Sequence, residues 1–250
     1  MDLQLALQVA NRAADAARKT ILARYMGRFS VSAKPDQSPV TEADREAETA
    51  IRHIIQQSFP EHAVLGEEFG GQDATGHCWL VDPIDGTVSF IHHIPMFSTL
   101  IALTSDREPL VAVVDLPALN RRFTAIRGQG SWEGKKRLAV PPGFEPARSM
   151  VCHGDPYQFR AAGREALYHT LEDRITFFRS YTDALGHCLV AAGSASLMVD
   201  PDLHSWDVAA PSLIVREAGG RVALHPDDDT GLMTMLSGSA EAVEWVERLL

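Results

Sequence analysis

Two aspartates around a tight turn are the residues of this sequence most suited to chemistry. Residues 79–87 (WLVDPIDGT) read as an apolar strand that ends in a carboxylate, turns at a proline and presents a second carboxylate before a glycine and a hydroxyl. Asp82 and Asp85 can converge on hard divalent cations, because such ions prefer carboxylate oxygens. The backbone amides of Gly86 and Thr87 can meet an anion on the same side. The segment therefore predicts a pocket that metal ions and a phosphate share.

Further acidic residues strengthen this interpretation. An isolated Asp-x-x-Asp is more often a simple turn cap, because aspartate favours turns. Here Glu67 and Glu68 follow an apolar residue and a glycine, 15 residues before Asp82, and Asp207 begins an otherwise apolar helical segment. The helix dipole alone would explain Asp207. Its apolar neighbours indicate a partly buried turn, however, and a buried carboxylate needs a partner such as a metal ion.

Taken together, these motifs resemble the inositol monophosphatase superfamily of magnesium-dependent, lithium-sensitive phosphatases. The resemblance covers almost the whole chain, from Lys34 to Gly220. It implies a layered α/β/α/β/α sandwich of the sugar-phosphatase type, with the site at strand ends between two sheets. The motifs that carry it are Gly-Glu-Glu at 66–68, Asp-Pro-Ile-Asp-Gly-Thr at 82–87, and Trp-Asp at 206–207 with a trailing Glu-Ala-Gly-Gly at 217–220.

The resemblance implies two magnesium ions in this pocket. Glu67, Asp82 and the Ile84 carbonyl would bind one ion. Asp82, Asp85 and Asp207 would bind the second. Two ions bridged by a carboxylate suit an in-line displacement at phosphorus, because they hold the phosphate and neutralise the leaving alkoxide.

The same resemblance implies roles for the neighbouring polar groups. Thr87 and Glu67 would orient the attacking water, together with Asp44 and a third, more weakly held magnesium. Asp85 and the amides of Gly86 and Thr87 would contact the substrate, the amides at phosphate oxygens. This agrees with the lack of a Lys or Arg cluster in the motif.

Substrate choice must depend on other residues, because the metal site accepts any phosphate monoester and only the leaving alcohol differs. By resemblance, residues 179–200 line the alcohol side of the pocket. The position of Asp183 is small and uncharged in inositol monophosphatases, whereas histidinol phosphatases of this superfamily carry an acid there. Histidinol phosphate leaves an alcohol with an ammonium and an imidazole, which a carboxylate would bind through charge-assisted hydrogen bonds. The favoured function is therefore histidinol-phosphate phosphatase, an enzyme of histidine biosynthesis.

Several alternatives stay open at this point. Asp183 could simply cap the helix that begins there. Asp200 stands where the family usually has a glutamate that contacts the alcohol, and its side chain is shorter by one methylene. An inositol-1-monophosphatase or a nucleotide or sugar phosphatase of the same superfamily is the second enzyme reading. A catalytically silent member that binds a metal or a partner is the non-enzyme alternative.

Hydrophobic periodicity predicts the elements that position these residues. An amphipathic helix runs from Leu3 to a stop at Gly27, a second begins at Thr41 with Asp44 as its capping partner and ends before Pro60, and a polar loop at 30–39 joins them. Strands follow at 78–81, 97–104, 110–116 and 122–126, and the short turns between the last three require antiparallel neighbours. Beyond residue 149 strands alternate with helices: strands at 150–153, 175–178, 197–200 and 233–236, and helices at 158–171, 183–192, 206–218 and 240–249.

Composition limits the partners. With 33 acidic and 23 basic residues the formal net charge is −10, which disfavours nucleic acid and anionic membranes as ligands. No apolar run approaches the roughly 20 residues of a membrane span. Three scattered cysteines argue against a disulfide framework or a zinc site. We expect a cytoplasmic enzyme that forms one domain over residues 1–250, acts on a small phosphate monoester, and forms a homodimer as the family usually does.

Other potential sites are weaker. His92 and His93 are adjacent and lack a zinc-binding spacing, which favours loop surface or the rim of a pocket. Gly128 and Gly130 lack the third glycine of a dinucleotide fingerprint and predict a turn. Cys188 lies on an apolar helix face and is expected to be inert core.

Overall fold

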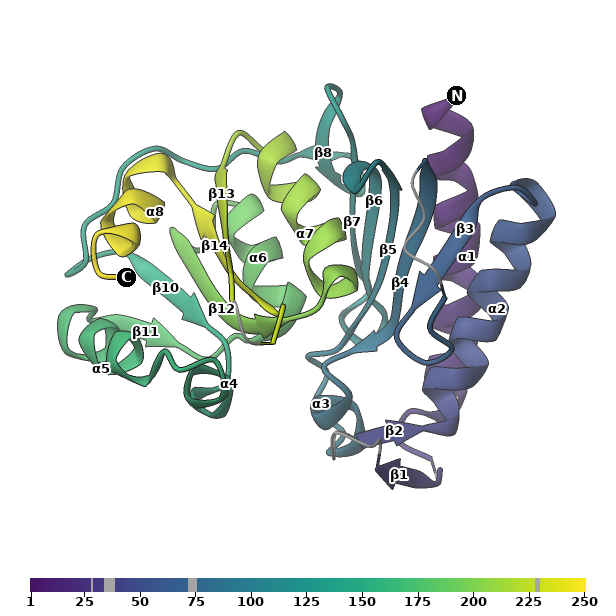
Figure 1. Cartoon of the computed structure of the whole chain (residues 1–250), viewed down its shortest axis with the longest axis horizontal. Coiled ribbons are helices and arrows are strands. Elements are labelled where there is room, and N and C mark those ends of the chain that lie inside the picture. The colour runs from purple at the N-terminus through teal and green to yellow at the C-terminus, as the bar shows by residue number, and fades with distance from the viewer. Residues whose placement is uncertain (28, 34–38, 72–75, 228–229) are drawn as a thin grey trace.

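Five layers, alternately helical and stranded, build the molecule (Figure 1). Two long helices cover one face of a seven-stranded sheet, a second pair of helices fills the space between this sheet and a five-stranded sheet, and short helices cover the far face. The computed structural model describes residues 1–27, 29–33, 39–71, 76–227 and 230–250. Within these ranges none of the helices combines the length and apolarity that a membrane span requires. The predicted α/β/α/β/α sandwich is confirmed.

Helices α1 (Leu3–Arg24) and α2 (Glu42–Ser58) form the first layer. Small side chains on α1, including Ala6, Ala10 and Ala14, are fully buried, and this allows the two helices to pack closely on the sheet. Thr41 caps α2, and the Asp44 side chain returns the hydrogen bond to the Thr41 amide at 2.8 Å. Both predicted helices and the capping pair are confirmed.

The seven-stranded sheet is buried on both faces, so its apolar residues alternate between two cores. Cys78 and Leu80 face the inner helices, whereas Trp79 and Val81 face α1 and α2. The first two strands are parallel and the others antiparallel, as the predicted meander required. In spatial order the strands are β3 (Ala63–Gly66), β4 (His77–Asp85), β5 (Ser98–Ser105), β6 (Glu108–Leu116), β7 (Arg121–Ile126), β8 (Gly130–Glu133) and β9 (Lys136–Arg137).

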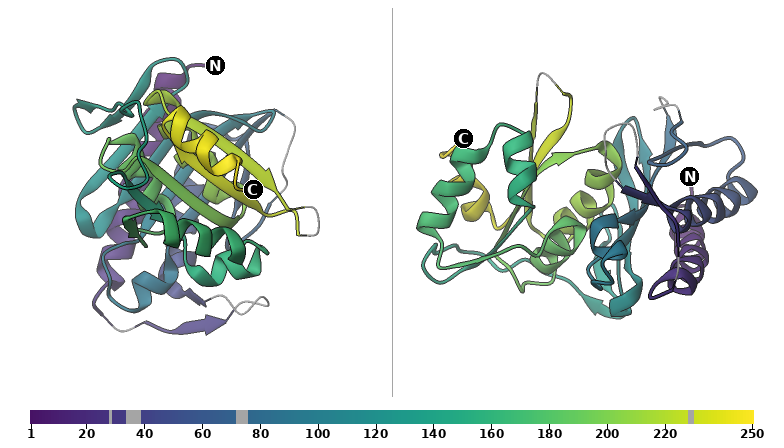
Figure 2. Two further views of the ribbon diagram at one scale, coloured as in Figure 1. Left: turned by 90° about the vertical axis from the view of Figure 1, so that its left-hand side faces the viewer. Right: turned by 90° about the horizontal axis from the view of Figure 1, so that it is seen from below.

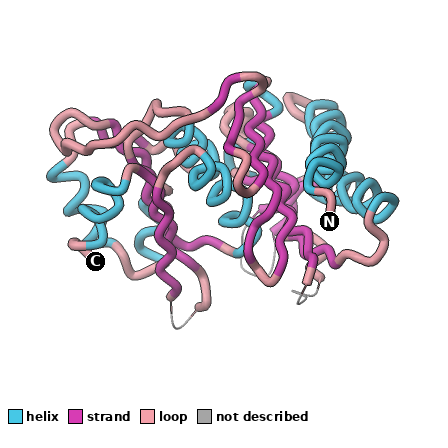
Figure 3. The backbone as a smooth tube through the Cα atoms, turned by 90° about the horizontal axis from the view of Figure 1, so that it is seen from above, coloured by secondary structure: helices cyan, strands magenta, loops and turns pink. Residues whose placement is uncertain are grey.

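The five-stranded sheet lies on the other side of the inner helices, as the views in Figures 2 and 3 show. Two of its neighbouring strand pairs are parallel and two are antiparallel. The two chain termini lie at opposite outer ends of the stack (Figure 3). In spatial order the strands are β11 (Phe177–Arg179), β10 (Met150–His153), β12 (Leu197–Leu203), β14 (Met233–Gly238) and β13 (Arg221–Pro226).

The inner helices α6 (Asp183–Ala191) and α7 (Ser205–Glu217) connect the two sheets. At the end of α7 the Glu217 carboxylate accepts hydrogen bonds from the amides of Gly128 (2.7 Å) and Gly130 (2.8 Å) in the turn between β7 and β8. This contact fixes the helix whose first turn carries Asp207. The remaining helices are the short α3 (Thr87–Ile91), the 3-10 turn η1 (Pro117–Leu119), and α4 (Pro156–Ala161), α5 (Glu165–Arg174) and α8 (Ala240–Glu247) on the far face.

Two predicted elements were wrong in detail. The single helix at 158–171 is two helices, α4 and α5, because Gly163 adopts a left-handed backbone (φ 65°) that ends the first of them. The polar loop at 30–39 contains a short antiparallel ribbon of β1 (Val31–Ala33) and β2 (Pro39–Thr41). Lys34 lies outside the described residues.

Candidate active site

The Asp-x-x-Asp motif ends β4 with an irregularity that turns both acids into the protein. Asp82 pairs with Leu100 and Asp85 with Ser98, so three steps on β4 oppose two on β5. Such a bulge bends a strand and re-aims its side chains. As a result Asp82 is 3% exposed and Asp85 is 9% exposed. Gly86 then adopts a left-handed backbone (φ 82°) and leads into α3.

Four carboxylates from three regions of the chain meet at this strand end. Burial raises the pKa of Asp82 well above its usual value, and the charges of Glu67, Asp85 and Asp207 raise it further. The pKa of Asp207 is raised in the same way, by burial first and then by Asp85 and Glu67. Since like charges act at this strength only over short distances, the predicted ligand residues are neighbours in space.

Asp85 is held by two hydrogen bonds from other parts of the chain. Its Oδ2 accepts hydrogen bonds from the Ser98 hydroxyl at 2.6 Å and from the Ala184 amide at 3.0 Å. Burial nevertheless raises the pKa of Asp85 to about 6, because the two donors offset only part of the desolvation and Asp200 and Glu67 add negative charge. The contact with Ala184 ties the motif on the large sheet to the first turn of α6.

Thr87 lies between the motif and α2. Its hydroxyl is 3.0 Å from the Ile84 carbonyl oxygen and 3.5 Å from Asp44 Oδ1. The second oxygen of Asp44, Oδ2, accepts hydrogen bonds from the Thr41 amide at 2.8 Å and the Thr41 hydroxyl at 2.5 Å. Burial raises the pKa of Asp44, and the Glu67 charge contributes. The structure thus brings together the residues for which a water-orienting role was predicted.

The donor set fits a hard divalent cation in its chemistry. The gathered groups are carboxylate oxygens and a backbone carbonyl, which are the ligands of magnesium. Asp82 Oδ1 is buried without a hydrogen-bond partner in the described part of the chain, as expected for an oxygen that serves an ion. As the side chains stand, the described residues contain no group of three His, Cys, Asp or Glu positioned to hold a metal.

Asp183 lies beside the motif, at the start of α6, with a left-handed backbone. Its backbone is left-handed (φ 58°), which is unusual for a residue other than glycine and is concentrated at functional sites. Its carboxylate lies against Gly86, since a Cβ on that glycine would be 3.0 Å from Asp183 Oδ2. Burial raises the pKa of Asp183 well above its usual value, and the charges of Asp85 and Asp200 raise it further. The first-turn amide of Ala184 is capped by Asp85 rather than by Asp183.

Asp200, on β12, is directed into the protein. It is 1% exposed, and its Oδ2 is 3.4 Å from His187 Nε2. The opposite nitrogen of that histidine, Nδ1, is 2.7 Å from the Ser237 hydroxyl. Asp200 still lies close enough to add to the raised pKa of Asp85 and Asp183. Asp200 therefore lies beside the site with its carboxylate against His187. Its contact with the leaving alcohol stays a prediction.

The other sequence features have structural explanations. His92 and His93 form an exposed turn after α3, and Gly128 and Gly130 form the turn that Glu217 caps. Cys188 is fully buried, and burial raises the pKa of its thiol well above the usual value.

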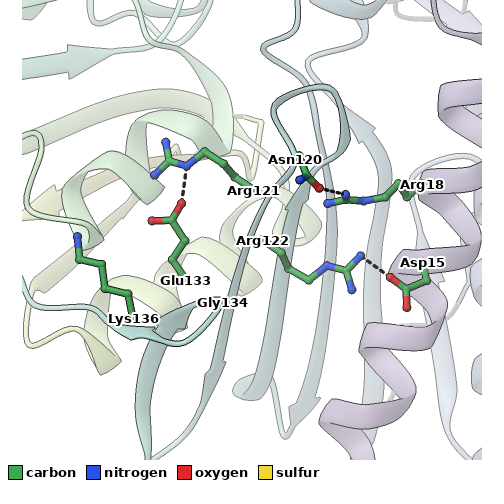
Figure 4. Close-up of a pocket in the computed structure, with 8 residues that line it drawn as sticks. All are labelled: Asp15, Arg18, Asn120, Arg121, Arg122, Glu133, Gly134 and Lys136. Atoms are coloured by element: carbon green, nitrogen blue, oxygen red, sulfur yellow. Dashed lines mark hydrogen bonds and ion pairs between the residues drawn. The ribbon is translucent and has the colours of Figure 1, made fainter.

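A separate open pocket of about 620 Å³ lies at the strands β7 and β8 and helix α1 (Figure 4). It contains four basic side chains, of which three pair with acids: Arg121 with Glu133 at 2.5 Å, Arg122 with Asp15 at 2.8 Å and Arg18 with Asp115 at 2.6 Å. Its lining residues are Asp15, Arg18, Asn120, Arg121, Arg122, Glu133, Gly134 and Lys136.

Sequence reasoning did not identify Ser98, the hydroxyl donor to Asp85. The signal was weak, because Ser98 starts a predicted strand and only the antiparallel pairing of β4 with β5 reveals its position.

Comparison with known proteins agrees with the site geometry. Residues 2–245 match the model described as the Inositol monophosphatase family. The histidinol-phosphatase of Mycobacterium tuberculosis is 39% identical over 227 residues, which cover 88% of this chain and 86% of that protein. The histidinol-phosphatase of Chlorobaculum parvum is 37% identical over 222 residues, with coverages of 88% and 84%. Among solved structures, the extragenic suppressor protein suhB of Bartonella henselae matches with a TM-score of 0.89 at 28% identity, over 98% of this chain and 97% of that chain.

Proposed function

Since the chain belongs to the inositol monophosphatase family and is a phosphomonoesterase of that family, we propose that its substrate is histidinol phosphate. Water and this ester would give histidinol and inorganic phosphate. The observation that carries the proposal is the placement of Asp183, whose carboxylate lies against Gly86 of the phosphate-binding motif while Asp85 caps the helix in its place. The similarity to two histidinol-phosphatases supports the same choice.

Asp183 would recognise the cationic end of the leaving alcohol. A carboxylate at this position can accept charge-assisted hydrogen bonds from an ammonium or an imidazolium. Its raised pKa would fall again when such a cation binds, because an opposite charge favours the ionised acid. An uncharged polyol would not lower the pKa of Asp183 in this way, because it carries no positive charge.

The gathered acids would hold two magnesium ions. Glu67, Asp82 and the Ile84 carbonyl would bind the first, and Asp82, Asp85 and Asp207 the second. Bound magnesium would supply the positive charge that neutralises the phosphate and the departing alkoxide. The buried, unpartnered Oδ1 of Asp82 supports this assignment within the described chain.

The remaining groups would position water and phosphate. Thr87, held between the Ile84 carbonyl and Asp44, would orient the attacking water together with Glu67. The amides of Gly86 and Thr87 would donate to phosphate oxygens. Water would form the new bond to phosphorus as the bond to the alcohol oxygen breaks, and the alcohol oxygen would leave with a proton.

A substrate panel at one fixed magnesium concentration tests the proposal. We expect kcat/KM for histidinol phosphate to exceed that for inositol-1-phosphate, a nucleoside monophosphate and an aryl phosphate. Equal or better hydrolysis of an uncharged-alcohol ester would reject histidinol phosphate as the substrate. Absence of turnover on every ester in the panel would favour a catalytically silent member that binds a metal or a partner.

An inositol-1-monophosphatase, or a nucleotide or sugar phosphatase of the same family, is the second candidate. The burial of Asp200 against His187 favours it, because a carboxylate engaged there is not available to bind a cationic alcohol. We further propose that residues 1–250 act as one domain and form a homodimer, which sedimentation would test.

A further inference from the structure

Two residues of α2 hold the loop that presents Glu67. The Arg52 guanidinium donates through Nη1 to the Val64 carbonyl at 3.2 Å and through Nη2 to the Gly70 carbonyl at 2.5 Å. Its Nε donates to Glu48 Oε1 at 2.7 Å. The guanidinium thus links β3, which precedes the loop, to Gly70 at the end of the loop.

Glu48 contacts the same loop as Arg52. It is fully buried, and its second oxygen, Oε2, accepts a hydrogen bond from the Glu68 amide at 2.7 Å. Its carboxylate packs directly against Gly66, where any Cβ would overlap Glu48 Oε1. Glycine is required at this position of the Gly-Glu-Glu motif because the Glu48 carboxylate occupies the space that a Cβ would fill.

These contacts leave the backbone of Glu67 fixed on both sides. The Gly66 amide donates to the Gly70 carbonyl at 3.0 Å, and the Glu67 amide donates to the Val81 carbonyl of β4 at 3.1 Å. On the other side, Glu48 holds the amide of Glu68. The direction of the Glu67 side chain toward Asp82 follows from this arrangement.

We propose that Glu48 and Arg52 are positioning residues that set the affinity of the site for magnesium by fixing Glu67. The inference rests on the proposed function, in which Glu67 is a magnesium ligand. Contacts behind metal ligands commonly contribute ten- to hundredfold in metal affinity, because they hold the ligand in its binding geometry. Loss of either residue should therefore weaken magnesium binding much more than it changes turnover at saturating magnesium.

Substitutions at both residues test the proposal. Glu48→Gln keeps the shape but places an amide NH2 against one of two donors, Arg52 Nε or the Glu68 amide. Arg52→Met keeps much of the side-chain length and removes every donor. Arg52→Lys keeps the charge but cannot reach two carbonyls and a carboxylate together. We expect the magnesium dissociation constant, measured by calorimetry without substrate, to rise about tenfold or more in Glu48→Gln and Arg52→Met and by less in Arg52→Lys.

Matched controls come from the same helix and its neighbour. Glu46→Gln changes an exposed acid of α2 whose partner is Arg24, at 2.5 Å, and Arg24→Met removes that partner. Both controls should bind magnesium as the wild type does. Excess magnesium should restore kcat of Glu48→Gln to within about threefold of the wild-type value, whereas a general loss of structure would not be restored.

The outcomes separate this inference from the proposed function. If the wild type binds magnesium, Asp82→Asn does not, and the Glu48 and Arg52 variants fold and bind with wild-type affinity, the positioning role is wrong. If Asp82→Asn binds magnesium as well as the wild type, the proposed metal site itself is wrong. Should Arg52→Met fail to fold, Glu48→Gln and Arg52→Lys decide the question, with circular dichroism as the check on folding.

Discussion

The amide of Ala184 donates to Asp85 Oδ2 at 3.0 Å, across 99 positions of the chain. Through this hydrogen bond the acid that ends β4 also caps the first turn of α6. The Ser98 hydroxyl donates to the same oxygen at 2.6 Å, which leaves Oδ1 directed elsewhere. In the proposed function this buried carboxylate would join the phosphate side and the alcohol side of the site. Asp85, rather than Asp183, accepts the hydrogen bond from the first-turn amide of α6.

The first prediction concerns the metal ligands. Asp82→Asn and Asp207→Asn should each lower kcat by more than about a hundredfold, since they remove ligands rather than the contacts behind ligands. In chelator at neutral pH the free energy of unfolding should stay within about 1 kcal/mol of the wild type or increase, because each substitution removes one of several repelling charges. Steady-state kinetics and denaturant unfolding measure the two effects. Near-normal turnover in either variant would show that the residue is not a ligand.

The second prediction concerns the stability of the metal-free protein as a function of pH. Folding raises the pKa of Asp85 from 3.8 to about 6, so between these values the folded state holds a proton that the unfolded state has lost. The contribution of Asp85 to stability therefore falls as pH rises from about 4 to about 6, by about 3 kcal/mol at most, at about 1.4 kcal/mol per pKa unit. The raised pKa values of Asp82, Asp183 and Asp207 act in the same direction, so stability falls further as these carboxyls lose their protons with rising pH.

Urea unfolding in chelator from pH 4 to pH 8 measures this effect. The difference between the wild type and Asp85→Asn isolates the contribution of this carboxylate, and the variant should show a shallower fall. Added magnesium should stabilise the protein more at pH 8 than at pH 5, because protons compete with the ion for the same oxygens. A difference between the two proteins that does not change with pH would contradict the prediction.

Much of the fold could be predicted from the sequence, because its strands are buried on both faces and its helices are amphipathic. The strands β4 to β7 and the helices α1, α2, α6 and α7 all follow from apolar periodicity. The edge strand β13 was missed, since its residues are mostly half-buried or exposed and it ends at Pro226. The break at Gly163 was also missed, because a glycine in a helical pattern does not by itself reveal a left-handed backbone.

The acids of the candidate site could be found in the sequence, but the contacts that hold them could not. The spacing of acids pointed to Glu67, Asp82, Asp85 and Asp207, and the structure brings them together. Contacts across the chain could not be seen, including the hydrogen bond from Ala184 to Asp85. In the sequence, Glu48 and Arg52 have only the i,i+4 spacing common to pairs on a helix surface, and the sequence does not show which loop lies over them.

The third prediction concerns divalent and monovalent cations. Magnesium should support hydrolysis, and excess chelator should abolish it, because the proposed ligands are all oxygen atoms suited to this ion. Calcium should inhibit, since it accepts a larger and looser coordination shell and would misplace the water. Lithium should inhibit as well, as the family resemblance implies. Rate measurements with each ion at fixed substrate test the set, and full activity in excess chelator would contradict it.

The last prediction concerns Asp183. Asp183→Asn should lower kcat/KM for histidinol phosphate roughly ten- to hundredfold. This corresponds to a loss of about 1.5 to 3 kcal/mol of transition-state stabilisation, the usual contribution of a hydrogen bond to a charged group. Hydrolysis of an uncharged-alcohol ester should barely change. The proposed magnesium site would contact the phosphate, which both substrates share, whereas Asp183 would contact the cationic end, which only one substrate carries. The backbone of the variant should remain in place, because asparagine tolerates the left-handed conformation (φ 58°) about as well as aspartate does. Equal losses on both substrates would show that Asp183 acts on the structure of the pocket rather than on the alcohol, and the inositol-1-monophosphatase candidate would then be preferred.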